Sequence, residues 1–241
     1  MNIIIAQDYN ELSEIAAGIV SAQIMIKSDS VLGLATGDTP LGMYKELIKM
    51  YETKKIDFFD VTVFNLDEYC NLSRKNPNSY YYYMKNNFFN YVNIKPENSY
   101  IPNGMAEDIE KECIRYEEKI KYKGGIDLQV LGIGSNGHIG FNEPDINFEA
   151  QTHLVNLDQE TIDANSRFFA SREEVPTKAI SMGIKTIMQS KMILLLASGE
   201  NKAQAIYKTI KGKISPEVPA SIIQLHPNAI IVADRDASKL L

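Results

Sequence analysis

A glycine-rich loop directly after an apolar run constrains the fold of this sequence more than any other feature. The run spans residues 126–133, and the turn into which it leads holds four glycines around Asn136 and His138, before Glu143. A short apolar run predicts a buried β-strand, and glycines allow positive φ angles and the close approach of a ligand to the backbone. The pattern predicts a strand that presents polar side chains from a loop at its end.

The side chains of this loop suit proton transfer. His138 is one of three histidines, and an imidazole exchanges protons readily near neutral pH. Glu143 and Asn136 are near enough in sequence to set the tautomer and orientation of its ring. An ordinary turn between a strand and a helix, with a solvent-facing histidine, is the alternative. We favour a site because histidine, asparagine and glutamate occur together among glycines.

Composition limits the domain organisation and the kind of ligand. The 241 residues, 44% of them hydrophobic, predict one domain that spans residues 1–241. The net charge of −6 argues against broad contact with nucleic acid or with an anionic membrane, so we expect a small-molecule ligand. Cys70 and Cys113 lack metal-binding or disulfide spacing and predict free thiols. The absence of a signal-peptide pattern and of a bilayer-spanning apolar run predicts a cytoplasmic location.

Strand-like and helix-like segments alternate along the whole chain. The predicted strands cover residues 3–6, 31–35, 61–66, 126–133, 152–157, 191–197 and 229–233, and residues 175–188 predict a strand followed by a helix. The other predicted helices begin near Asp8 or Asn10, at Pro40, near Asn78 or Ser79, at 106 and after 202, with a short one over 219–225; residues 158–169 predict a helix or an irregular segment. This alternation predicts a Rossmann-like, doubly wound α/β fold, with a mostly parallel sheet and helices on both faces.

The turn Thr36-Gly37-Asp38-Thr39 follows the second predicted strand. We expect Thr39 to cap the next helix and Pro40 to be its first residue. The free N–H groups and the positive dipole end of such a helix suit a phosphate. Because every strand–helix unit needs a turn, an ordinary structural role is an equal alternative here.

Two further polar groups follow predicted strands. Asp67 and Glu68 end the third strand, where a carboxylate suits a catalytic base, although a solvated turn or a helix cap is the commoner role. Lys202 follows the strand 191–197. Because loops after parallel strands meet at one edge of a sheet, all these groups should converge. Together they suit a sugar phosphate. The sequence has no dinucleotide, ATP or zinc motif, so we expect neither a cofactor nor a metal.

Four motifs carry a resemblance to a known family. They are Asn65–Tyr69, Gly132–Pro144, Asn165–Phe169 and Leu225–Pro227. On these motifs, nearly the whole chain resembles the glucosamine-6-phosphate deaminases. The phosphogluconolactonases have a similar fold and share a glycine–histidine loop, but not the Phe-Asn-Glu-Pro ending of the second motif, which favours the deaminase.

The resemblance implies a reaction and a role for each site residue. Glucosamine 6-phosphate and water would become fructose 6-phosphate and ammonia. His138, oriented by Glu143 and Asn136, would open the sugar ring, and Asp67 would then move the C2 proton to C1 through an enolamine. This order agrees with the chemistry, since the C2 proton is acidic only once the C1 carbonyl is exposed. The substrate-binding residues implied are Thr36, Gly37, Asp38, Thr39, Gly137, Arg167 and Lys202.

The sequence departs from some members of the family at two points. Asn136 stands where some relatives carry aspartate, and we expect it to orient the histidine all the same. Since the sequence stops at Leu241, before the extra segment of the hexameric, allosteric relatives, we expect a monomer or small homo-oligomer.

We also expect residues 145–172 to close over the substrate. The alternatives are a non-catalytic sugar-phosphate sensor and a lactone hydrolase of the 6-phosphogluconolactonase type.

Overall fold

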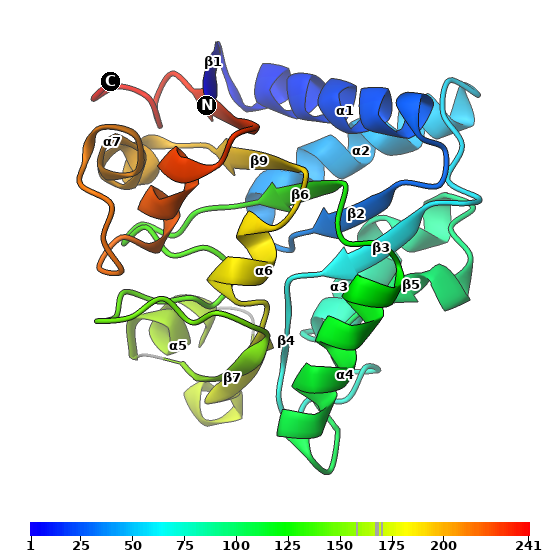
Figure 1. Ribbon diagram of the computed structural model, residues 1–241, viewed down its shortest axis with the longest axis vertical. Coiled ribbons are helices and arrows are strands. Elements are labelled where there is room, and N and C mark those ends of the chain that lie inside the picture. Colours follow the sequence, from blue (N-terminus) through cyan, green and yellow to red (C-terminus); the bar gives the residue numbers. More distant parts are fainter. Residues whose placement is uncertain (158, 167–168, 170) are drawn as a thin grey trace.

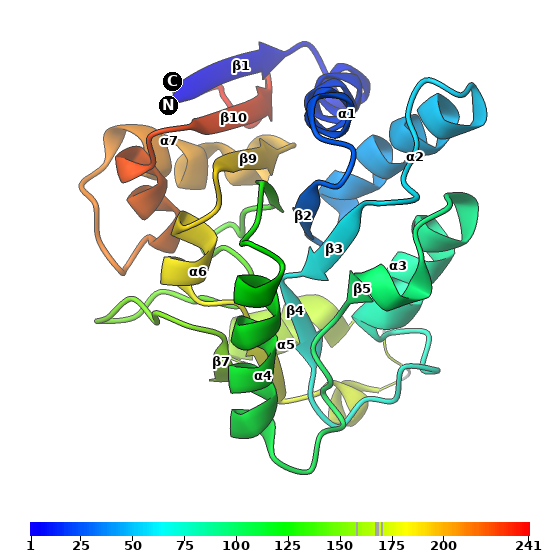
Figure 2. The ribbon, with the colours of Figure 1, turned by 45° about the vertical axis from the view of Figure 1, so that its right-hand side comes forward.

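A seven-stranded parallel sheet forms the centre of the protein (Figure 1). The computed structural model describes residues 1–157, 159–166, 169 and 171–241. The strand order is β1-β10-β9-β6-β2-β3-β5, and Figure 2 shows the strands from β1 at one edge to β5 at the other. These strands are β1 (Asn2–Ala6), β2 (Val31–Leu34), β3 (Thr62–Asn65), β5 (Ser99–Tyr100), β6 (Leu128–Leu131), β9 (Met192–Ala197) and β10 (Ala229–Asp234). The predicted mostly parallel α/β fold is confirmed.

Helices cover both faces of this sheet. The α-helices are α1 (Tyr9–Ile26), α2 (Asp38–Glu52), α3 (Tyr80–Asn87), α4 (Ile109–Tyr122), α5 (Gln159–Ser166), α6 (Ile184–Met188) and α7 (Ala203–Lys211), and the short 3-10 helices are η1 (Phe89–Tyr91), η2 (Pro96–Asn98), η3 (Arg172–Glu174), η4 (Glu200–Lys202) and η5 (Pro219–Leu225). Of these, α5 lies away from the main sheet, and its Ile162 packs in a separate cluster with Tyr69 and Ala179. Successive residues of a strand point to opposite faces. Leu194 and Leu196 of β9 therefore pack with α1 and α2, whereas Ile193 and Leu195 pack with α4, α6 and α7.

Two of the three predicted helix caps are confirmed. The Asp8 side chain accepts the N–H groups of Asn10 and Glu11 at the start of α1, and Ser79 accepts that of Tyr82 in α3. The prediction for α2 was wrong: the helix begins at Asp38, and Gly37, at φ 102°, is its N-cap. This left-handed conformation turns the chain into the helix early, so Thr39 lies inside α2.

A second, three-stranded antiparallel sheet lies beside the main sheet and was not predicted. It has the order β4-β8-β7, formed by β4 (Asp67–Tyr69), β8 (Lys178–Ser181) and β7 (His153–Asn156). Asp67 therefore does not end β3: the chain leaves the main sheet after Asn65, and Asp67 starts a new strand that pairs with Ser181. Leu66 joins the two sheets, since its N–H donates to Leu34 O and its carbonyl accepts the N–H of Met182.

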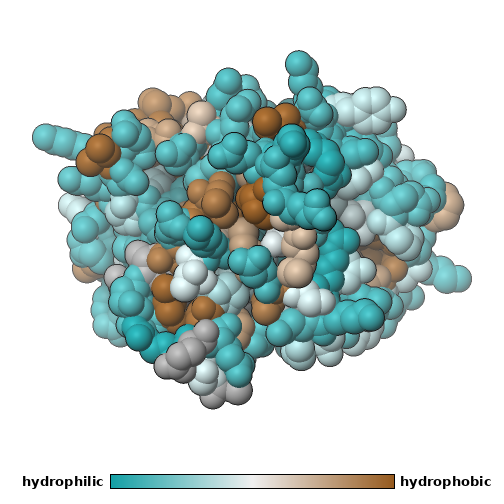
Figure 3. Space-filling view, turned by 90° about the horizontal axis from the view of Figure 1, so that it is seen from below, coloured by the Kyte–Doolittle hydropathy of each residue, from teal (hydrophilic) through white to brown (hydrophobic). Residues whose placement is uncertain are grey.

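The two termini lie close together at the β1 edge (Figures 1 and 2). The face in Figure 3 shows hydrophobic residues in small groups among hydrophilic ones. Within the described residues, no helix is long and apolar enough to cross a membrane.

Candidate active site

Four neighbouring strands of the main sheet lead into the predicted site residues. The strands β9, β6, β2 and β3 are adjacent, and their carboxyl ends open into residues 198–202, 132–143, 36–39 and 66–67. Parallel strands end at a common edge, and a ligand in such a fold binds there. The predicted convergence of these segments is confirmed by the strand order.

The glycine-rich loop after β6 joins His138, Glu143 and Asn136 by hydrogen bonds. His138 Nδ1 lies 3.0 Å from Glu143 Oε2, and Asn136 Nδ2 donates to the same oxygen at 2.9 Å. The backbone N–H of His138 donates to Asn136 Oδ1 at 3.1 Å. With Glu143 ionised, Nδ1 carries the ring hydrogen and Nε2 is left to accept a proton. The predicted orienting contacts of Glu143 and Asn136 are present.

Two glycines give this loop its shape. The ring of His138 lies over Gly134, where a β-carbon would come within 2.4 Å of Cε1. Gly137 has φ +94°, and a β-carbon there would lie 2.7 Å from Val218 Cγ1. The carbonyl of Gly137 accepts the N–H of Ala220 at 2.9 Å, so a hydrogen bond joins the loop to η5. Larger residues at either glycine would displace the loop.

The end of the loop is bonded to β8, which the sequence did not reveal. The N–H of Phe141 donates to Ser181 Oγ at 3.0 Å, and Asn142 Nδ2 donates to Ile139 O and Met182 O, both at 2.8 Å. Asn142 belongs to the Phe-Asn-Glu-Pro motif, so its identity was a signal, but its partner is forty residues away in the chain.

Asp67 is a buried carboxyl beside this loop. Asp67 is only 6% exposed. Its carboxyl lies next to Gly140 of the loop, where an added β-carbon would be 3.7 Å from Asp67 Oδ2. Among the described residues, no group donates a hydrogen bond to its Oδ1. Burial first, and the neighbouring charge of Glu68 second, raise the pKa of Asp67 to about 8. A carboxylate with this pKa is a strong base near neutral pH.

Glu68 binds the first turn of α3, as in the helix-cap alternative for this pair, but it does so in the protein interior and not in solvent. It is 2% exposed and accepts the N–H groups of Tyr80 and Tyr81, in the first turn of α3, each at 2.9 Å. The alternative of a solvated turn is wrong for both carboxyls because all three residues of β4 are buried.

The predicted phosphate turn and Lys202 lie near each other. Burial lowers the pKa of Lys202, and the charge of Asp38 opposes this effect. Lys202 ends η4, after Gly199 at φ +92°. The carboxylate of Asp234 fixes this turn, since it accepts the hydroxyl of Ser198 at 2.5 Å and the N–H of Gly199 at 3.0 Å. Arg167, also predicted at the site, lies outside the described residues.

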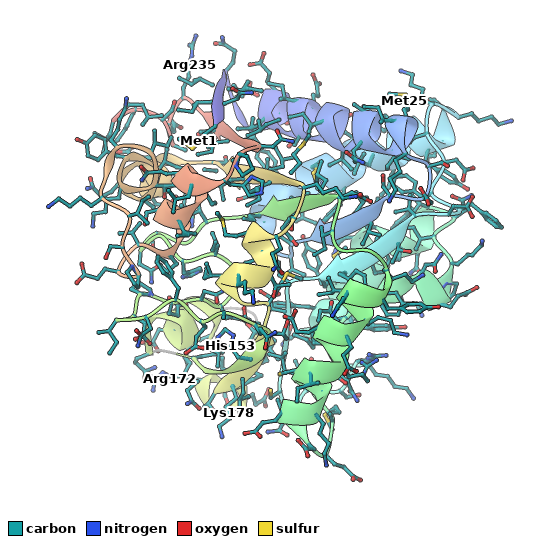
Figure 4. All side chains as sticks on the ribbon, in the orientation of Figure 1. Met1, Met25, His153, Arg172, Lys178 and Arg235 are labelled. Carbon is teal, nitrogen blue, oxygen red and sulfur yellow. The ribbon has the colours of Figure 1, made fainter. Side chains whose placement is uncertain are left out.

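The other two histidines each lie within hydrogen-bonding distance of a backbone carbonyl. His153 lies on β7 (Figure 4), with Nδ1 2.9 Å from Gln151 O. His226 is buried, with Nε2 2.8 Å from Ser190 O. No group of three or more metal-ligating side chains is found in the part of the chain that the structure describes.

A cavity of about 230 Å³ lies beside the site. It is lined by residues 141–143, 145, 147–149 and 153–156 with Ile184 and Pro219, and it shares Glu143 with the site but not Asp67 or His138. Part of the segment predicted to close over a substrate forms its wall. Residues 149–152 of that wall are fixed, since Glu149 O accepts the N–H of Ile184 and Thr152 N–H donates to Glu117. Closure by the segment stays a prediction.

The fold and site define an α/β protein with candidate proton-transfer groups and an adjacent cation at the carboxyl edge of a parallel sheet. Residues 9–232 match the family described as glucosamine-6-phosphate isomerases/6-phosphogluconolactonase. A glucosamine-6-phosphate deaminase of Clostridium acetobutylicum is 64% identical over 241 residues, which cover 100% of both chains. One of Clostridium botulinum is 61% identical over 100% of this chain and 99% of its own. The chain therefore belongs to the glucosamine-6-phosphate isomerase/6-phosphogluconolactonase family.

Solved structures agree with this assignment. One, described as a monomeric glucosamine-6-phosphate deaminase, has a TM-score of 0.97 and 49% identity, with 100% of both chains covered. A 6-phosphogluconolactonase of Thermotoga maritima has a TM-score of 0.77 at 18% identity over 97% of this chain and 99% of its own, which shows the shared fold alone.

Proposed function

We propose that this protein converts glucosamine 6-phosphate and water to fructose 6-phosphate and ammonia. The observation that carries the proposal is the pairing, at one sheet edge, of the His138–Glu143 hydrogen bond with the buried carboxyl of Asp67. The high identity to relatives named glucosamine-6-phosphate deaminase over their full length supports the same function.

The first step is the opening of the sugar ring. Nε2 of His138 accepts the proton of the C1 hydroxyl and returns a proton to the ring oxygen as the C1–O5 bond breaks. The imidazolium that forms in between is stabilised by Glu143, whose Oε2 lies 3.0 Å from Nδ1. Asn136 holds Glu143 in place by donating to the same oxygen. The product is the open-chain aldehyde.

The second step is the isomerisation. The C1 aldehyde makes the C2 proton acidic, and the Asp67 carboxylate removes it while the substrate ammonium gives a proton to O1, which yields an enolamine. Asp67 then returns the proton to C1, which leaves an imine at C2. Water adds to this imine, the C2–N bond breaks, and ammonia leaves with fructose 6-phosphate. The burial of Asp67 strengthens it as a base for this transfer.

Substrate binding rests on the phosphate group. The N–H groups at the start of α2, from the turn of Thr36, Gly37, Asp38 and Thr39, and the ammonium of Lys202 form its binding site in this proposal, with Arg167 and the backbone of Gly137 as further contacts. The carboxylate of Asp38 interacts with the charge of Lys202. We propose a monomer or small homo-oligomer, a single domain and a cytoplasmic location.

The test is the release of ammonia and fructose 6-phosphate from glucosamine 6-phosphate by the wild type and by Asp67→Asn. We expect product from the wild type and a loss of at least about 1,000-fold in kcat for the variant, with the sugar phosphate still bound. If the wild type binds glucosamine 6-phosphate without turnover, the protein is a sensor. If it instead hydrolyses 6-phosphogluconolactone, and Asp67→Asn does so equally well, it is a lactonase.

A further inference from the structure

We propose that Glu68 is a positioning residue that stays ionised beside Asp67 and thereby keeps Asp67 a strong base. This inference rests on the function proposed above, in which Asp67 moves the proton between C2 and C1. Glu68 follows Asp67 on β4, so the two side chains point to opposite faces of that strand, and Glu68 does not touch the substrate in this account. Its effect on the reaction acts through Asp67.

The carboxylate of Glu68 is held by three backbone N–H groups. Its Oε1 accepts those of Tyr69 and Tyr80, and its Oε2 accepts that of Tyr81, each at 2.9 Å. Two of the three donors belong to the first turn of α3, where the helix dipole favours a negative charge. Hydrogen bonds of this kind stabilise the ionised form of a carboxyl, and both oxygens are engaged although the residue is only 2% exposed.

Asp67, one residue away, has the opposite surroundings. It is also buried, but no described group donates to its Oδ1. Burial raises the pKa of both carboxyls above their ordinary values. For Glu68 the N–H groups of Tyr80, Tyr81 and Tyr69 offset part of this rise, whereas no described group offsets it for Asp67. Adjacent titratable groups with opposed surroundings take different roles, one ionised and one exchanging a proton.

The other described groups that interact with Asp67 are uncharged in the relevant pH range. Tyr69 on β4, Tyr44 on α2, Tyr80 on α3 and Tyr116 on α4 each interact with its charge, and burial raises the pKa of all four hydroxyls. Gly140 of the loop and Ser181 of β8 also face Asp67 and carry no charge. Glu68 interacts in addition with Cys70, whose pKa burial raises to about 11, and with the cation Arg74. Within the part of the chain that the structure describes, Glu68 is thus the charge that acts on Asp67.

The same contacts fix the position of the base relative to the glycine-rich loop. Glu68 joins β4 to the start of α3, and the ring of Tyr80 there lies 4.9 Å from that of Tyr69 and stacks on Phe141 at 6.0 Å. Phe141 is bonded to β8 and precedes Glu143 by two residues. The strand that carries Asp67 and the loop that carries His138 are therefore packed through one aromatic group.

The test is the pH profile of kcat/KM for glucosamine 6-phosphate in Glu68→Gln. Glutamine keeps the size and one acceptor oxygen but removes the charge. We expect the acid limb, which reports the deprotonation of Asp67, to move about one pH unit lower, and kcat at pH 8 to fall about tenfold because a weaker base abstracts the C2 proton more slowly. Glu68→Asp, which keeps the charge, should retain the limb near its wild-type position.

A matched control separates this role from mere burial of a carboxyl. Glu112 is 6% exposed and also accepts a backbone N–H, from Asn103, with its charge paired to Arg115. Glu112→Gln should leave the acid limb unmoved. A folded Glu68→Gln with the wild-type limb and kcat would overturn the proposal and leave the deaminase function intact, whereas a wild type that releases no ammonia refutes the function itself.

A direct titration keeps the proposal testable if Glu68→Gln does not fold. In wild-type protein labelled with ¹³C at the side-chain carboxyls of aspartate and glutamate, NMR follows each proton loss, and the spectrum of Asp67→Asn assigns the Asp67 signal. A buried glutamate that ionises at lower pH than Asp67, and whose shift responds to Asp67→Asn, supports the proposal. If every glutamate near Asp67 stays protonated until Asp67 has ionised, the proposal is wrong.

Discussion

Replacement of Asp67 by asparagine should abolish activity and at the same time stabilise the fold. Asparagine keeps the shape of the side chain but cannot ionise. In the wild type, the pKa of Asp67 rises from its ordinary value of 3.8 to about 8, chiefly because the carboxyl is buried. Between these two values the folded state binds one more proton at this position than the unfolded state does. The stability of the wild type must therefore fall as the pH rises, and the variant lacks this loss.

The size of the effect follows from the shift. The stability that the protonated Asp67 carboxyl contributes to the folded state is fully present below pH 3.8 and is lost as the pH rises through about 8. One pH unit in this window corresponds to about 1.4 kcal/mol. At pH 7, about three units above the ordinary pKa, the variant should gain up to about 4 kcal/mol over the wild type. Entry of water near the carboxylate would reduce this upper limit.

Urea unfolding at several pH values measures the effect. We expect the difference in unfolding free energy between Asp67→Asn and wild type to grow from pH 5 to pH 8, with equal slopes against urea concentration in the two proteins. Above pH 8 the difference should level off. A difference that stays constant over this range would show that Asp67 titrates as it does in the unfolded chain, and the argument for a strong base would fail.

Three further substitutions test other parts of the site and fold. Glu143→Gln should lower kcat about 100-fold with KM little changed, because the imidazolium of His138 loses its anionic partner; an unchanged kcat in steady-state assays would exclude this role. Lys202→Met should raise KM about 100-fold with kcat within a few-fold, while Lys208→Met, at an exposed position of α7, should change neither. Asp127→Asn should lower the free energy of unfolding in urea by about 2 kcal/mol. Buried Asp127 binds Lys27, Lys191 and the N–H of Val31 at the amino end of the strands, and the substitution removes its charge. The kcat per folded molecule should not change.

The periodicity of the sequence was sufficient for the main sheet. Strands such as β9 have continuous apolar runs because both of their faces are covered, and such runs are visible without any tertiary information. The two-residue strand β5 was missed because Ser99 and Tyr100 form too short a segment for any pattern. Capping residues were predicted correctly at Asp8 and Ser79, where a side chain makes the cap, and not at Gly37, where the backbone conformation turns the chain.

The glycine-rich loop illustrates what local sequence can reveal about a candidate site. Asn136, His138 and Glu143 lie within eight residues, and their mutual hydrogen bonds depend on the turn that the glycines between them allow. Residues this close in the chain have few ways to meet, so their grouping predicted their contact. The resemblance of the surrounding motif to a known family then supplied the reaction.

The sequence by itself determined the fold class, the edge of the sheet where the site lies and the pairing of His138 with Glu143, because all three follow from local patterns and from the handedness of strand connections. Only the tertiary structure decided the environment of Asp67. Its burial in an antiparallel sheet, and the bonding of Glu68 to a helix that starts twelve residues later, arise from segments far apart in the chain. The pKa of a carboxyl depends on the solvent and the charges around it, and these exist only once the chain has folded.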